Sequence, residues 1–67
     1  MKDEEKKEKI LNILTNEWQS TREIAVACKI DWYQIKALLT EMYYETEEVE
    51  RIKLNKRLIW RKKINVN

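Results

Sequence analysis

Hydrophobic residues near the start of the chain recur at the spacing of a helix. One stripe predicts a helix over about residues 3–16, and it consists of Ile10, Leu11, Ile13 and Leu14. The residues before this stripe are charged, so we expect the beginning of the helix to be solvated. Trp18 follows in a short connector, where we expect its large side chain to fill the core.

A capping signal and a second apolar stripe predict a short helix over about residues 21–29. Ser20 is a good N-cap, and Glu23 follows at the position that completes a capping box. No glycine is present to end this helix, so we expect Lys29 to occupy a strained turn. Small side chains on the inward face would permit close helix crossing, and this face is expected to contain Ile24, Ala25, Ala27 and Cys28.

A third helix is predicted over about residues 32–45. Asp31 supplies its N-cap, with Gln34 three residues further on as the capping-box partner. The turn before it is short and contains Ile30, which is expected to point inward. Such a turn forces the two helices to cross at a steep angle, as in a helix-turn-helix. The core positions of the third helix recur at helical spacing and are Ile35, Leu38, Leu39 and Met42.

The last third of the chain has the pattern of a β-hairpin. Apolar and charged residues are interleaved over 49–54 and 57–63, on either side of Asn55-Lys56. This pattern predicts two strands joined by a two-residue turn, together spanning about residues 49–63. The whole chain is therefore expected to be one α+β domain over residues 1–67, mostly helical, with three helices and a C-terminal two-stranded hairpin.

The pattern leaves the register of the hairpin open. On the first strand Val49, Arg51 and Lys53 share one face, whereas Ile52 lies on the other. Because apolar residues fall on both faces, a bulge or a twist is plausible. On the return strand, Leu58 and Trp60 share a face opposite Ile59 and Arg61.

The composition excludes several classes of function. The 67 residues include no glycine, no proline and no histidine. Without glycine no phosphate-cradling loop can form, and without histidine the commonest general base is missing. Histidine is also missing as a ligand for a metal site. The chain is too short to build a walled carboxylate cleft comfortably. We therefore expect neither catalysis nor a cofactor.

The single cysteine, Cys28, lies in an apolar stretch and is expected to be a buried small hydrophobe instead of a reactive thiol. One unpaired cysteine also fits a reducing, intracellular setting. No stretch approaches the ~18 apolar residues of a membrane span, and no signal-peptide pattern opens the chain. We therefore expect a cytoplasmic protein. Charged residues make up 39% of the chain and are rich in Lys and Glu, as in hyperthermophile proteins.

The formal net charge of +2 hides a sharp division along the chain. Residues 41–50 carry five glutamates and no positive charge, while residues 51–63 carry seven lysines and arginines and no negative charge. A basic hairpin on a nearly neutral protein is expected of an element that contacts phosphates. The alternative is a solvated edge strand, on which lysines prevent aggregation. In either case Arg61, Lys62 and Lys63 can balance the glutamates.

Together these segments resemble the winged helix-turn-helix family, and the resemblance covers nearly the whole chain. The chain looks like the small winged-helix proteins of hyperthermophilic archaea and their viruses. Many family members have a glycine before the first wing strand, where this chain has residues 44–48. A non-glycine residue is therefore expected to adopt an awkward conformation there, unless the loop is longer. The matching positions are residues 20–25 and 30–35, Leu38, Leu39, Met42, and residues 49–51 and 59–61.

The resemblance implies that the third helix enters the major groove of DNA while the wing contacts the backbone. Its favoured contacts on that helix are Tyr33, Lys36 and Thr40, followed by Gln34 and Trp32. Trp32 has an alternative role, which is to pack on the second helix or on Trp18. Contacts with phosphates are implied at the start of the second helix and on the wing, from Thr21, Arg22, Lys53, Asn55, Lys56 and Arg57.

Two functions fit this pattern best. A third, the binding of single-stranded nucleic acid or RNA by aromatic stacking, is disfavoured because the aromatic residues are not laid out on a sheet face. The first is a DNA-binding transcription regulator whose partner is double-stranded DNA. The second is a winged-helix module that binds a protein partner in a larger complex, with exposed aromatic residues as anchors. The basic wing favours the first function and the acidic junction favours the second. The sequence leaves monomer and homodimer open and indicates no membrane partner. The candidate anchors are Trp32, Tyr33, Tyr43 and Tyr44.

Overall fold

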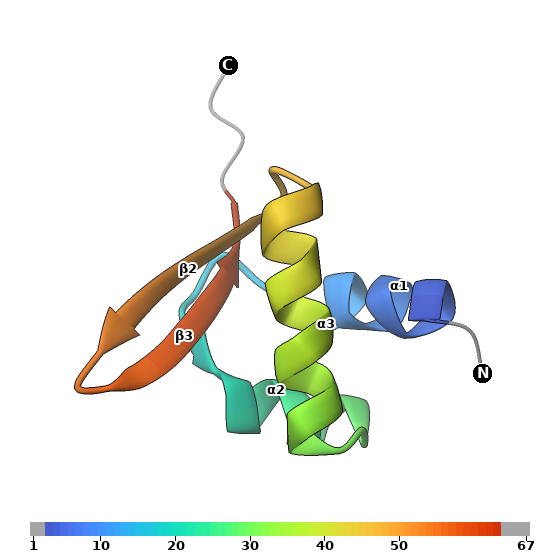
Figure 1. The fold of residues 1–67 in the computed structure, drawn as a ribbon, viewed down its shortest axis with the longest axis horizontal. Helices are drawn as coiled ribbons and strands as arrows, with labels where there is room; N and C mark the ends of the chain where they lie inside the picture. Colours follow the sequence, from blue (N-terminus) through green and yellow to red (C-terminus); the bar gives the residue numbers. More distant parts are fainter. Residues whose placement is uncertain (1–2, 64–67) are drawn as a thin grey trace.

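The computed structural model describes residues 3–63, which form an α+β fold that is about half helical (Figure 1). The expected α+β class is therefore confirmed. Helix α3 stands at the centre of Figure 1, with the hairpin on one side of it and α1 on the other. The elements follow the order α1 (Asp3–Ile13), β1 (Gln19–Ser20), α2 (Thr21–Cys28), α3 (Trp32–Glu45), β2 (Val49–Leu54) and β3 (Arg57–Lys62).

Helix α1 ends at Ile13, three residues before the expected end at residue 16, because Thr15 makes hydrogen bonds outside the helix. The Thr15 hydroxyl accepts a hydrogen bond from the Glu17 N–H at 3.2 Å, and its carbonyl accepts one from the Lys62 N–H at 2.7 Å. A threonine side chain that bonds to nearby backbone competes with the helix. The chain therefore leaves α1 early and attaches to β3.

The expected two-stranded hairpin is present as β2 and β3, but the sheet in the described part of the chain has a third strand that was not expected. Gln19 pairs with Trp60 and Ser20 pairs with Ile59, which adds β1 antiparallel to β3. The strand order is β1-β3-β2, and β3 is central. A two-residue strand is too short to show alternation in a sequence, and the second residue of this one, Ser20, is also the N-cap of α2.

The hairpin is regular over its whole length. Pairing runs without interruption from Val49 opposite Lys62 to Leu54 opposite Arg57, so the bulge considered above is absent. The two-residue turn is confirmed, and both of its residues have positive φ, 50° at Asn55 and 65° at Lys56. Positive φ at both central positions is the conformation of the type I′ turn that matches strand twist.

Arg51 explains why no bulge is needed. It lies on the same face of the sheet as the buried Val49, and it pairs with Trp60 across the ladder. Its guanidinium carbon lies 4.3 Å from the centre of the Tyr43 ring. Stacking on an aromatic ring lets a guanidinium occupy an inward position. The strand therefore keeps its alternation despite a charge on the inner face.

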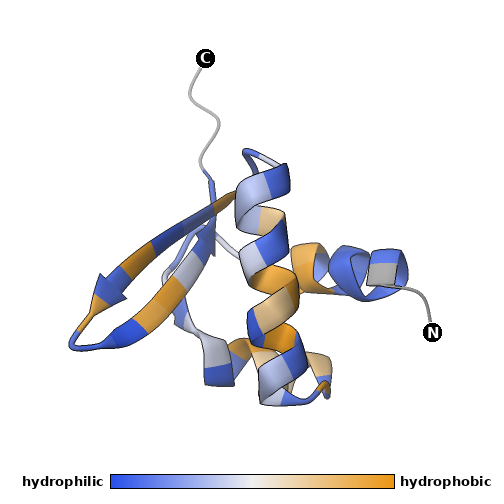
Figure 2. Ribbon diagram, viewed as in Figure 1, coloured by the Kyte–Doolittle hydropathy of each residue, from blue (hydrophilic) through white to orange (hydrophobic). Residues whose placement is uncertain are grey.

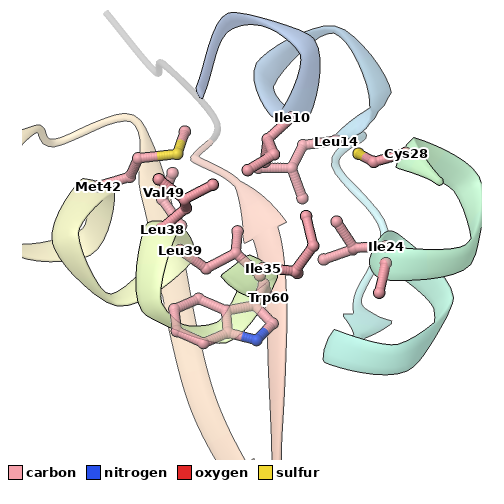
Figure 3. Packing of buried hydrophobic residues seen from close by; sticks show 11 residues of the cluster. Ile10, Leu14, Ile24, Cys28, Ile35, Leu38, Leu39, Met42, Val49 and Trp60 are labelled. Atoms are coloured by element: carbon pink, nitrogen blue, oxygen red, sulfur yellow. The ribbon is translucent and has the colours of Figure 1, made fainter. Parts of the chain in front are cut away.

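The core lies where the three helices meet the sheet. Figure 2 shows hydrophobic segments of α1, α2 and α3 facing one another, and Figure 3 shows their side chains converging above Trp60. All four core positions expected on α3 are buried, and so is Cys28, as expected. The cluster consists of Ile10, Leu14, Ile24, Ala25, Cys28, Ile35, Leu38, Leu39, Met42, Val49 and Trp60.

Two expected core residues lie elsewhere. Ala27 is exposed, because the inward stripe of α2 includes Thr21 and continues at spacings of three and four residues through Ile24, Ala25 and Cys28. Trp18 is half-buried outside the core cluster, and the guanidinium of Arg61 lies 4.4 Å from its ring centre.

The helix ends follow local hydrogen bonding. Ser20 and Asp31 cap α2 and α3 as expected, with their side chains accepting from the Glu23 and Tyr33 N–H groups at 3.1 Å. Lys29 has φ 57° and ψ 40°, which confirms the strained turn after α2. Ile30 packs half-buried against the core.

The junction between α3 and β2 is not strained, contrary to expectation. Thr46 is extended, with φ −126°, and its hydroxyl donates to the Met42 carbonyl at 2.9 Å. The same hydroxyl oxygen accepts from the Glu48 N–H at 3.2 Å. Between residues 3 and 63, positive φ occurs at Lys29, Asn55 and Lys56 only. The threonine side chain thus ends α3 without a left-handed residue.

Candidate nucleic-acid interface

A basic groove lies between α2, α3 and the turn of the hairpin. Its volume is about 360 Å³, and four of its lining residues are cations while none is a carboxylate. These cations come from three separate segments: Arg22 from α2, Lys36 from α3, and Lys56 and Arg57 from the hairpin. The other lining residues are Ser20, Thr21, Trp32 and Leu58.

Local structure sets the position of each cation. The Ser20 cap starts α2 at Thr21, which places Arg22 in its first turn. Lys36 lies one turn after Trp32, which begins α3. The tight turn of the hairpin holds Lys56 and Arg57 at its tip. The groove therefore depends on the fold, and no single segment forms it.

A buried pair of hydrogen bonds connects α2 to β3 beneath the groove. The indole N–H of Trp60 donates to the Thr21 hydroxyl at 2.8 Å, and that hydroxyl donates to the Leu58 carbonyl at 3.4 Å. Thr21 is 5% exposed. The Thr21 hydroxyl is therefore occupied inside the protein. The expected phosphate contact at the start of α2, from backbone N–H groups and Arg22, stays a prediction.

Trp32 forms one wall of the groove. Its ring meets the Tyr33 ring edge-on, with centroids 5.0 Å apart and planes at 87°. The Lys36 ammonium lies 5.2 Å from the centre of the indole. Trp32 therefore contacts its own helical neighbours, while Trp18, its other expected partner, lies beneath Arg61.

The outward face of α3 is continuous and uncovered. Tyr33 and Tyr44 are 77% and 73% exposed, and Lys36 and Ala37 are also exposed between them. Thr40 is half-buried, and its hydroxyl donates to the Lys36 carbonyl at 2.7 Å, which leaves its oxygen able to accept. These five residues recur at spacings of three and four, so they share one side of the helix.

The remaining candidates lie outside the groove lining. Gln34 is exposed on α3, and Asn55 is exposed in the turn. Lys53 is exposed on β2 opposite Leu58, a lining residue, so it borders the groove. Sequence reasoning did not identify Ser20 and Leu58 as lining residues. The alternation along β3 places Leu58 and Trp60 on one face of the strand, but it gives no indication of the groove.

The ion pairs of the described residues join side chains outside the groove lining. The Lys7 ammonium donates to Glu45 at 3.0 Å and forms an ion pair with Glu41 at 3.7 Å, which connects α1 to α3. Glu50 pairs with Arg61 at 3.0 Å, so the expectation that Arg61 balances a glutamate is confirmed. Among residues 3–63, none of the four groove cations forms an ion pair.

In comparisons with known proteins, no protein-family model, curated protein or solved structure matches the chain. Within residues 3–63, no helix has both the length and the apolar character needed to cross a membrane. The same residues contain no cluster of three or more His, Cys, Asp or Glu side chains placed to hold a metal ion.

Proposed function

We propose that this chain is a winged helix-turn-helix protein that binds double-stranded DNA and regulates transcription. The observation that supports the proposal is the basic groove. Arg22, Lys36 and Arg57 belong to three different elements, yet they line one hollow without a carboxylate. Four like charges gathered in one concave surface repel one another, and a polyanion relieves that repulsion.

The proposed complex places α3 in the major groove of the duplex. The groove of B-DNA is wide enough to admit an α-helix, and the uncovered face from Tyr33 to Tyr44 would enter it. Lys36 can donate to a guanine edge, and the Thr40 oxygen can accept from a base. Arg22 and the hairpin tip then meet the phosphates on either side. The chain carries out no catalysis in this proposal.

Two triple variants with matched charge test the proposal. The groove variant carries Arg22→Gln, Lys36→Gln and Arg57→Gln, and the control carries Lys9→Gln, Lys62→Gln and Lys63→Gln. All six side chains are exposed, and each variant lowers the formal net charge from +2 to −1. Affinity for a random-sequence duplex is measured by fluorescence anisotropy at several salt concentrations.

The wild-type protein is expected to bind with a steep salt dependence. The groove variant is expected to lose affinity and to show a shallower slope of log affinity against log salt, by roughly 0.9 for each phosphate that the variant no longer neutralises. The control is expected to stay close to wild type. Equal losses in the two variants would show that net charge alone drives binding, and no binding at low salt would end the proposal.

A protein-binding module is the second candidate, and the exposed tyrosines favour it. Tyr33 and Tyr44 are among the most exposed large side chains of the described residues. Aromatic side chains of this kind anchor protein interfaces. If the chain binds no duplex, capture of a protein partner by wild type but not by a Tyr33→Ala/Tyr44→Ala variant would support this second function.

A further inference from the structure

Trp32 is a large aromatic residue that the fold leaves partly exposed. Trp60 is fully buried and Trp18 is covered by Arg61, whereas Trp32 keeps 39% of its surface exposed on the groove wall. Exposed indole surface is unfavourable in water. A basic groove with an indole wall suits a ligand that has both a phosphate and a flat ring.

The groove has room for more than a phosphate. Its volume of about 360 Å³ falls within the range of ~300–1,000 Å³ typical of small-molecule sites. A phosphate of a paired strand lies on a surface and needs no such hollow. The cations of α2 and of the hairpin tip can hold a phosphate, while Trp32 and Leu58 offer apolar surface for a ring or a sugar.

Lys36 would serve both parts of such a ligand. Its ammonium now lies 5.2 Å from the centre of the Trp32 ring. A cation–π contact at an exposed site is weaker than the stacking of a base on an aromatic side chain. A base that stacks on the indole would therefore displace the ammonium, which is then available to pair with the phosphate.

We propose that the groove binds one nucleotide whose base is neither paired nor stacked in a duplex, with the base against Trp32 and the phosphate between Arg22 and Arg57. The inference rests on the proposed function, since a bound duplex with an unpaired end would bring this nucleotide to the groove. Bases in the interior of a duplex have both faces covered by their neighbours, so the groove can take up a whole base only where that base is unpaired. A free nucleotide has the same chemistry.

The experiment compares a blunt duplex with the same duplex carrying a short 3′ or 5′ overhang, by fluorescence anisotropy at fixed salt. At least one overhang duplex is expected to bind roughly fivefold or more tightly, which corresponds to the lower end of base–aromatic stacking. An overhang of abasic nucleotides keeps the phosphates and is expected to lose the preference.

Three variants identify the stacking residue. Trp32→Ala is expected to abolish the overhang preference, and Trp32→Phe is expected to keep most of it. Val26→Ala is the control, because Val26 is an exposed apolar residue of α2 outside the groove. It should leave the ratio of the two affinities unchanged. A Trp32→Ala variant that weakens blunt and overhang binding equally would overturn the inference.

A second arm uses adenosine monophosphate without DNA. Saturable quenching of tryptophan fluorescence that is lost in Trp32→Ala, without any overhang preference, would assign the site to a free nucleotide. Equal affinity for blunt and overhang duplexes together with no quenching overturns the inference and leaves duplex binding intact. Failure to bind any duplex overturns the proposed function instead, and the adenosine monophosphate arm then decides the inference alone.

Discussion

At the scale of single residues, Thr21 joins the candidate site to the fold. Its hydroxyl accepts from the Trp60 indole at 2.8 Å and donates to the Leu58 carbonyl. Trp60 is fully buried, so its N–H has no access to water and needs this partner. One side chain therefore connects the start of α2 to β3, the central strand of the sheet.

Replacing Thr21 with Val tests that connection. The shape is kept but the buried indole N–H loses its acceptor, so we expect the free energy of unfolding to fall by about 1–3 kcal/mol. Thr21→Ser keeps the hydroxyl and should cost less than Thr21→Val. Urea denaturation of the three proteins measures the difference, and a Val variant as stable as wild type would show that the bond contributes nothing.

Cys28 gives a prediction about pH. Burial raises the pKa of its thiol above the ordinary value of 9.0, while Lys9 partly opposes the rise. Below pH 9.0 the thiol is protonated in both folded and unfolded chains, so its full contribution to stability is present. As pH rises further, the unfolded chain releases the proton first, and stability is lost until the folded pKa is passed.

The Cys28→Ala variant isolates this effect. It should be less stable than wild type at neutral pH, because the change leaves a small cavity, but its stability should decline less steeply above pH 9. Urea midpoints measured between pH 7 and pH 10.5 compare the two proteins. Parallel pH profiles would mean that the thiol stays neutral in the unfolded chain or ionises equally in both states.

At the scale of elements, the hairpin turn combines strain with charge. Lys56 has φ 65°, a conformation that costs a non-glycine residue about 1–2 kcal/mol. Glycine is the usual residue at this position of a type I′ turn. The chain carries a cation there, and that cation lines the groove. Strain of this kind is often found at functional sites.

Lys56→Gly should therefore separate stability from binding. We expect the free energy of unfolding to rise by about 0.5–1 kcal/mol, since relief of the left-handed strain exceeds the added entropy of the unfolded chain. Affinity for a duplex should fall, because one groove cation is removed. Denaturation and anisotropy measure the two effects, and a variant that gains both stability and affinity would contradict a role for Lys56 in binding.

The elements that could be predicted from the sequence are those with a repeated or local signal. The core positions of α3, the caps Ser20 and Asp31, and the two-residue turn each have a signal within a few residues. Strand β1 has no such signal, because two residues pair with β3 only after the chain has folded. The early end of α1 likewise depends on Thr15 meeting Lys62, which is distant in sequence.

At the scale of the whole molecule, charge is divided between two regions. The groove cations lie free of carboxylates in the described structure, while Lys7, Glu41 and Glu45 pair between α1 and α3. The resemblance of the sequence to the winged helix-turn-helix family implied most of the groove residues as contacts with DNA. It did not predict that they line one hollow, because that requires the crossing of α2 and α3 and the attachment of β3 through Thr21.

A titration of isotopically labelled protein with a short duplex, followed by NMR amide shifts, tests the central claim most directly. We expect the largest shifts at Arg22, Tyr33, Lys36 and Arg57 and almost none on α1, which lies beyond α3 from the hairpin (Figure 1). Shifts concentrated on α1 or around Glu41, or no shifts at low salt, would contradict the claim that the basic groove and the outward face of α3 bind DNA.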